Sequence, residues 1–68
     1  MTKQTLDKLP EGIRANIEYY KEAYNLFDTG SHYKDEERSR MAGYVHGLRD
    51  AGLITEIERR ELFCYMTV

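Results

Sequence analysis

A short stretch in the C-terminal half, residues 47–58, constrains the fold more than any other part of this chain. Gly52 can adopt the left-handed conformation that closes a helix just past its C-cap. Leu53 then takes the position at which the closing motif places an apolar residue against the last helical turn. Thr55 and Glu58 have the spacing of a capping box, in which each side chain bonds the other residue's backbone N–H. The stretch therefore predicts a helical hairpin.

Upstream of the hairpin, a first helix is predicted over residues 10–28. Pro10 suits the first position of a helix, where its missing N–H is not needed, and Glu11 adds negative charge that the helix dipole favours. Gly30 is the expected closing residue. The apolar residues recur every three or four positions, as one face of a helix requires: Ile13, Ile17, Tyr20, Tyr24 and Phe27.

Two further helices are predicted over residues 34–51 and 55–66, on either side of the hairpin turn. In the last of them, Ile57 is expected to face inward. Gly43 and Gly47 fall inside the preceding helix, although a glycine there costs about 1 kcal/mol relative to alanine. We explain both glycines by close approach of the first helix, whose tyrosines are large. The inward-facing residues of the middle helix have helical spacing: Met41, Tyr44, Val45 and Leu48.

The two ends of the chain have less regular patterns. Residues 1–9 lack sustained periodicity and are predicted to form a flexible arm, from which Leu6 and Leu9 are able to fold back as one short turn. At the other end, residues 62–68 are apolar on nearly every side, so that one helix face cannot bury them all. This tail either leaves the helix as an extended strand or forms an interface. The prediction is an all-α, three-helix bundle in a single domain over residues 10–68.

The size and charge of the chain limit its functions. The core of a 68-residue chain supplies only roughly 3–5 kcal/mol, and no disulfide or zinc spacing reinforces it. Self-association as a homodimer, or docking on a partner, is therefore expected. The net charge of −2, from 10 basic and 12 acidic residues, lacks the positive excess that phosphate groups require.

The predicted location is the cytoplasm. The first residues lack the apolar core of a signal peptide, and no apolar run is long enough to cross a bilayer. The lone Cys64 fits a reducing compartment, where an unpaired thiol behaves as a small apolar side chain. No interaction with a membrane is expected.

No catalytic, cofactor-binding or metal-ligating residue is predicted. Of the two histidines, only His32 has a partner, Glu36, at a spacing that resembles half of a metal site. A catalytic Cys64 would need a paired base and an orienting group, which no motif supplies. The chain also lacks a Glu-x-x-His motif and a phosphate-binding glycine loop. We therefore predict that it is not an enzyme and needs no cofactor.

A helix–turn–helix regulator that binds nucleic acid is the alternative interpretation. In such proteins the second helix of the pair enters the major groove. Here that helix would begin Thr55-Glu56-Ile57-Glu58-Arg59-Arg60-Glu61, with three acids against two bases. Because these acids would meet the phosphates, nucleic acid is the less favoured partner.

The tyrosine content indicates a protein-binding surface. The chain has six tyrosines and two phenylalanines but no tryptophan. Tyrosine is typical of interfaces, since its ring is apolar and its hydroxyl tolerates water. The competing interpretation is that these rings cover the rim of a thin core. We predict contact residues on the first helix and in the tail: Tyr19, Tyr20, Tyr24, Phe63, Tyr65 and Met66.

The hairpin residues also resemble a known family. Leu48-Arg49-Asp50-Ala51-Gly52-Leu53-Ile54-Thr55-Glu56, followed by Glu58, is similar to the short C-terminal domain family of bacterial proteins, helical hairpins with a Leu-x-x-x-Gly-Leu-Ile-Thr-x-x-Glu core. The similarity ends after Glu61, where residues 62–68 replace a lysine-rich ending. The overall make-up resembles small accessory proteins of temperate bacteriophages and other mobile elements. That resemblance implies a stoichiometric regulator or inhibitor of a host or phage protein, and it implies no particular functional residues.

Overall fold

The computed structural model describes residues 2–68. These residues form four α-helices and no strand. Helix α1 spans Thr2–Lys8, α2 spans Glu11–Leu26, α3 spans His32–Asp50 and α4 spans Glu56–Thr67. The predicted all-α class is confirmed. The predicted count of three helices is wrong by one, because α1 occupies most of the segment that was expected to be a flexible arm.

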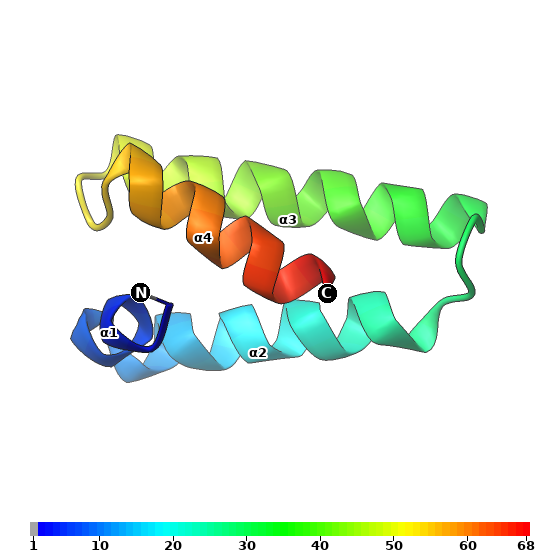
Figure 1. Ribbon diagram of the computed structural model, residues 1–68, viewed down its shortest axis with the longest axis horizontal. Helices are drawn as coiled ribbons and strands as arrows, with labels where there is room; N and C mark the ends of the chain where they lie inside the picture. Colours follow the sequence, from blue (N-terminus) through cyan, green and yellow to red (C-terminus); the bar gives the residue numbers. More distant parts are fainter. Residues whose placement is uncertain (1) are drawn as a thin grey trace.

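Helix α4 is the central element of the fold. Helices α2 and α3 run antiparallel along the 32 Å length of the molecule, and α4 lies across both of them (Figure 1). Helix α1 sits at one end and packs chiefly against α4. Each of the other three helices therefore contacts α4. None of the four described helices is long and apolar enough to cross a membrane.

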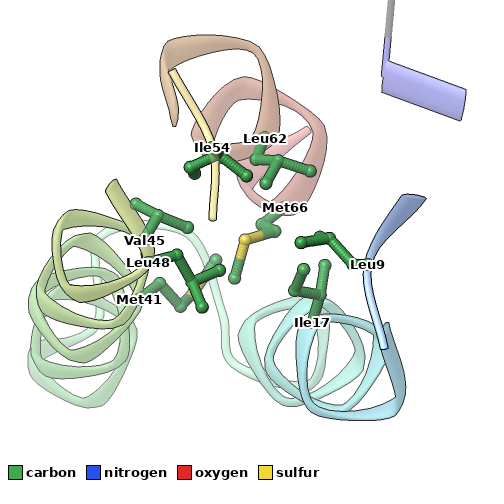
Figure 2. Close-up of a cluster of buried hydrophobic side chains, with 8 residues drawn as sticks. All are labelled: Leu9, Ile17, Met41, Val45, Leu48, Ile54, Leu62 and Met66. Carbon is green, nitrogen blue, oxygen red and sulfur yellow. The ribbon is translucent and has the colours of Figure 1, made fainter. Parts of the chain in front are cut away.

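The core lies where α2, α3 and α4 face one another. Figure 2 shows its side chains converging from these three helices and from the segments that precede α2 and α4. Met41, Leu62 and Met66 have no exposed surface, so that long flexible side chains fill the middle of the core. The complete set of buried apolar residues is Leu9, Ile17, Met41, Val45, Leu48, Ile54, Leu62 and Met66.

The hairpin between α3 and α4 forms as predicted. Gly52 has φ +78°, and the N–H of Leu53 donates to the carbonyl of Leu48 at 3.0 Å, which closes α3. The N–H of Glu58 donates to Thr55 Oγ1 at 3.2 Å, and the N–H of Thr55 donates to Glu58 Oε1 at 2.8 Å. Both halves of the capping box are therefore present, and α4 begins immediately after Thr55.

The connection between α2 and α3 differs from the prediction. Helix α2 ends at Leu26, because Phe27 has extended backbone dihedrals. Ser31 caps α3 by accepting a backbone N–H with its hydroxyl, so that α3 begins at His32. Gly30, with φ +83°, lies in the turn before Ser31 and does not close α2 directly. The two helix boundaries consequently shift by two residues each.

The N-terminal segment belongs to the folded structure. Leu9 is buried at 4% exposure and Thr5 at 1%, and Leu6 packs beside the core. The N–H of Leu9 donates to the carbonyl of Leu6 at 3.1 Å, which ends α1 just before Pro10. Pro10 is the N-cap of α2 rather than its first helical residue, one position away from the prediction. The fold-back of Leu6 and Leu9 is thus observed, as part of a helix.

The apolar tail remains helical as far as Thr67, so the extended alternative is wrong. Leu62 and Met66 are buried, Phe63 and Tyr65 are half-buried, and Cys64 is exposed. One face does not have to bury the whole tail, because α4 has neighbours on several sides. Packing around α4, rather than a change of conformation, accommodates these residues.

The glycines inside α3 are not explained by packing within the chain. At Gly43 and at Gly47, an added Cβ would meet no described atom within 4 Å apart from the helix's own neighbouring backbone. Both residues are exposed. Close approach of α2 therefore does not require them, and that interpretation is wrong.

Candidate functional site

Aromatic side chains gather where α2 and α3 lie side by side. The rings of Tyr20 and Tyr44 have their centroids 5.2 Å apart, and Tyr19 meets Tyr20 edge-on at 6.0 Å. Where the connection joins α2 to α3, Phe27 and Tyr33 stack at 6.0 Å. These ring contacts join α2 directly to α3. With the neighbouring Leu26 they define the aromatic face: Tyr19, Tyr20, Leu26, Phe27, Tyr33 and Tyr44.

The aromatic face combines fixed and exposed side chains. Tyr20 and Tyr44 pack against the core, and the Tyr44 hydroxyl accepts a hydrogen bond from Asn16 Nδ2 at 3.2 Å. By contrast, the exposed fractions are 67% for Tyr19, 82% for Leu26 and 65% for Tyr33. Scattered apolar residues on a surface are ordinary, but rings held next to one another form a patch that other proteins can bind.

The structure separates the residues that were predicted for binding. Tyr19 and Tyr20 lie on the aromatic face, whereas the half-buried Tyr24 has Lys34 Nζ over its ring at 4.4 Å. Phe63 is half-buried beside the Arg38 guanidinium, 5.5 Å from the ring centroid. Met66 has no exposed surface at all. The six residues therefore do not form one continuous surface.

Tyr65 fastens the end of α4 to α2. Its hydroxyl donates to Glu18 Oε1 at 2.6 Å, and Lys21 Nζ donates to the Tyr65 carbonyl at 2.9 Å while lying 4.5 Å from the ring centroid. The Glu18 carboxylate raises the pKa of Tyr65 above its ordinary value, because it accepts a hydrogen bond from the neutral phenol and would repel a phenolate. Tyr65, which was predicted to contact a partner, is thus bonded within the chain.

Glu58 joins the hairpin to α1. Besides closing the capping box, its carboxylate lies 2.7 Å from Lys8 Nζ and accepts a hydrogen bond from Thr5 Oγ1 at 3.2 Å. These interactions favour the charged form, so that Lys8, followed by the Thr55 N–H, lowers the pKa of Glu58 to about 2. One side chain therefore supports both the start of α4 and the position of α1.

The Glu56 carboxylate accepts hydrogen bonds from three arginines at the hairpin. Arg59 bonds it through two nitrogens at 2.8 and 2.6 Å, Arg49 at 2.7 Å and Arg60 at 3.0 Å. Arg59 and then Arg49 hold the pKa of Glu56 well below its ordinary range. Three arginines of the hairpin, one from α3 and two from α4, are thus paired with one carboxylate at the start of α4, the helix that would face DNA in a helix–turn–helix protein.

Besides the aromatic face, a stripe of exposed apolar residues runs along α4, and it was not predicted from the sequence. Ile57 is 70% exposed and therefore does not face inward as expected. Cys64 is exposed, and Val68, just past the helix, is 84% exposed. Arg60 and Glu61 lie between them in the sequence. The helical spacing of residues 57, 64 and 68 was the available signal, but the chain's apolar tail masked it.

Sites for small ligands are not evident within residues 2–68. In this part of the chain no three His, Cys, Asp or Glu side chains are placed to hold a metal ion, and no pocket is found. His32 Nε2 lies 2.8 Å from Glu36 Oε1, as one exposed pair at the start of α3. Comparison with protein-family models, with curated proteins and with solved structures found no match to the chain.

Proposed function

We propose that the chain is a small protein-binding module that acts stoichiometrically, as a regulator or inhibitor of another protein, through the aromatic face. The observation that carries this proposal is the exposure of Tyr19, Leu26 and Tyr33, at 67%, 82% and 65%, beside rings that are packed against the core. Partly fixed aromatic side chains are typical of interface hot spots, because little side-chain entropy is lost when a partner covers them.

The shape and the glycines of this side support the same function. The molecule measures 32 × 19 × 19 Å, so that one long side offers roughly the 800 Å² per partner that standard interfaces bury. Gly47 lies one turn from Tyr44 on α3, and open space above its Cα admits a partner's backbone. Host and phage proteins are the partner candidates that the resemblance to accessory proteins implies.

The test is capture of the partner by the tagged chain in its native cell, followed by mass spectrometry. The decisive variant is Tyr19→Ser/Leu26→Ser/Tyr33→Ser, which changes three exposed side chains and should leave the helical content unchanged. The matched control is Ile57→Ser, which alters an equally exposed residue on α4. A partner retained at equal stoichiometry by the wild type and the control, and lost by the triple variant, supports the proposal. Equal capture by all three proteins contradicts it.

A further inference from the structure

The side of α4 that is turned away from the other helices carries a distinct pattern. Apolar Ile57 and Cys64 are exposed there, and Arg60, 72% exposed, and the half-buried Glu61 separate them in the sequence. In Figure 1 α4 lies in front of α2 and α3, so that this outer side faces the viewer. We propose that a second copy of this chain binds here, with the two α4 helices packed antiparallel about a two-fold axis between residues 60 and 61.

The residue pattern is symmetric about that axis. In an antiparallel pair, positions at equal distances on either side of the axis lie opposite each other. Ile57 then meets Cys64 of the second copy, and Arg60 meets Glu61 of the second copy. Leu53, 40% exposed in the hairpin turn, and Val68 lie just beyond the two ends of α4 and are equally far from the axis in the sequence. At both pairs of positions on α4, apolar thus faces apolar and positive faces negative, which is the self-complementarity that a two-fold interface needs.

Charge selects the antiparallel arrangement over the parallel one. Side-by-side parallel helices would bring Arg60 against Arg60 and Glu61 against Glu61, and like charges destabilise a contact. A parallel pair would also align the two helix dipoles, whereas the antiparallel pair opposes them. The same four charges are therefore repulsive in one arrangement and attractive in the other.

The length of α4 sets the strength of the association. Twelve residues of helix are only about 18 Å long, and one helix–helix contact buries less than the roughly 1,200 Å² of a standard interface. The dimer should consequently be weak and should form at micromolar or higher concentration. The proposal involves none of the residues of the aromatic face and does not depend on the proposed function.

Oxidative cross-linking tests the pairing of individual residues. Ile57→Cys, with the native Cys64 retained, places two thiols opposite each other across the axis. In the controls, wild type and Ile57→Cys/Cys64→Ser, each copy has one thiol, and the two thiols of a dimer lie seven residues apart, about 10 Å along the axis, which is too far for a disulfide. Ile57→Cys should therefore form covalent dimers at least about tenfold faster than either control.

Cross-linking of a control at the rate of Ile57→Cys, or no cross-linking of Ile57→Cys at concentrations where the protein self-associates, would overturn the proposed arrangement. So would a wild type that sediments as a monomer at millimolar concentration. Because Ile57 is exposed, its substitution leaves the core intact, and an unchanged thermal melt of the reduced proteins checks this.

A charge exchange tests the central pair separately. Arg60→Glu places like charges opposite each other twice in the dimer and should weaken dimerisation about tenfold in sedimentation equilibrium. Arg60→Glu/Glu61→Arg restores opposite charges across the axis and should return the dissociation constant to within about threefold of the wild type. An unaffected Arg60→Glu, or a double variant as weak as the single one, contradicts the antiparallel pairing.

Discussion

The hairpin between α3 and α4 and the N-terminal helix α1 meet at one carboxylate, yet they are held by interactions of different range. In the hairpin, Thr55 and Glu58 are three positions apart. Helix α1 is held by Thr5 and Lys8, which reach Glu58 across 53 and 50 residues of sequence. Local signals therefore define the hairpin, whereas a helix of seven residues is stable only when the folded protein supports it.

The largest effect is expected where α1 joins the core. Leu9→Ala should lower the free energy of unfolding by about 2–4 kcal/mol, because it removes a buried leucine side chain and leaves a cavity. Urea denaturation measures this difference. The control is Leu26→Ala, which changes an 82% exposed leucine and should stay within about 0.5 kcal/mol of the wild type. If both variants unfold alike, Leu9 is not an anchor and α1 is loosely attached.

A smaller effect is expected at the hairpin turn. Gly52→Ala should destabilise the fold by about 1–2 kcal/mol, because the left-handed backbone at φ +78° is unfavourable for a residue with a Cβ. An added Cβ would meet no described atom within 4 Å, so that only the backbone conformation opposes the change. Thermal unfolding monitored by circular dichroism is sufficient here. A neutral result would show that the hairpin tolerates another helix ending.

The order of these effects reflects what was readable in the sequence. The periodic apolar residues of α2 and α3, together with the helix-closing glycine and the capping box of the hairpin, were sufficient to predict three helices. Helix α1 was missed because the side-chain bonds that hold it are long-range: Thr5 and Lys8 reach Glu58, 53 and 50 residues away in the sequence. The α2–α3 connection was misplaced because Phe27 leaves the helix for an extended conformation that its apolar periodicity does not indicate.

The candidate surfaces were predicted less completely than the helices. Tyr19 and Tyr20 do belong to the aromatic face, but its partners Tyr33 and Tyr44 come from α3, and sequence spacing cannot show which residues of two helices meet. Met66 was predicted to lie on a surface, but it is buried. The tail is apolar on nearly every side, so its sequence does not indicate which side of the helix faces the core. The position of α4 between its neighbours determines which side that is.

The two glycines within α3 are expected to lower the stability of the fold. Gly43→Ala and Gly47→Ala should each stabilise the fold by up to about 1 kcal/mol, because both positions are helical and open. Chemical denaturation should show a higher midpoint with an unchanged slope. Destabilisation by either change would mean that α3 is more closely approached than its open surface indicates.

The smallest effect concerns Glu58, where the two compared regions meet. Its pKa is about 2 in the folded protein against an ordinary value of 4.5. A carboxylate whose pKa is lowered by folding contributes stability above its unfolded pKa. That contribution should be lost as the pH falls from about 4.5 towards 2. The loss should be modest, because Lys8 is 46% exposed and solvent screens the pair.

Glu58→Gln distinguishes the two roles of this side chain. Glutamine can still complete a capping box, but it cannot form an ion pair with Lys8. Stability measured from pH 5 to pH 2 should therefore fall less steeply for Glu58→Gln than for the wild type, while α4 keeps its start. Thr55→Ala is the counterpart: it removes a cap worth about 1 kcal/mol but leaves the Lys8 pair, so that the pH dependence of the wild type should remain. If Glu58→Gln and the wild type show the same pH dependence, the attachment of α1 does not rest on the charge of Glu58.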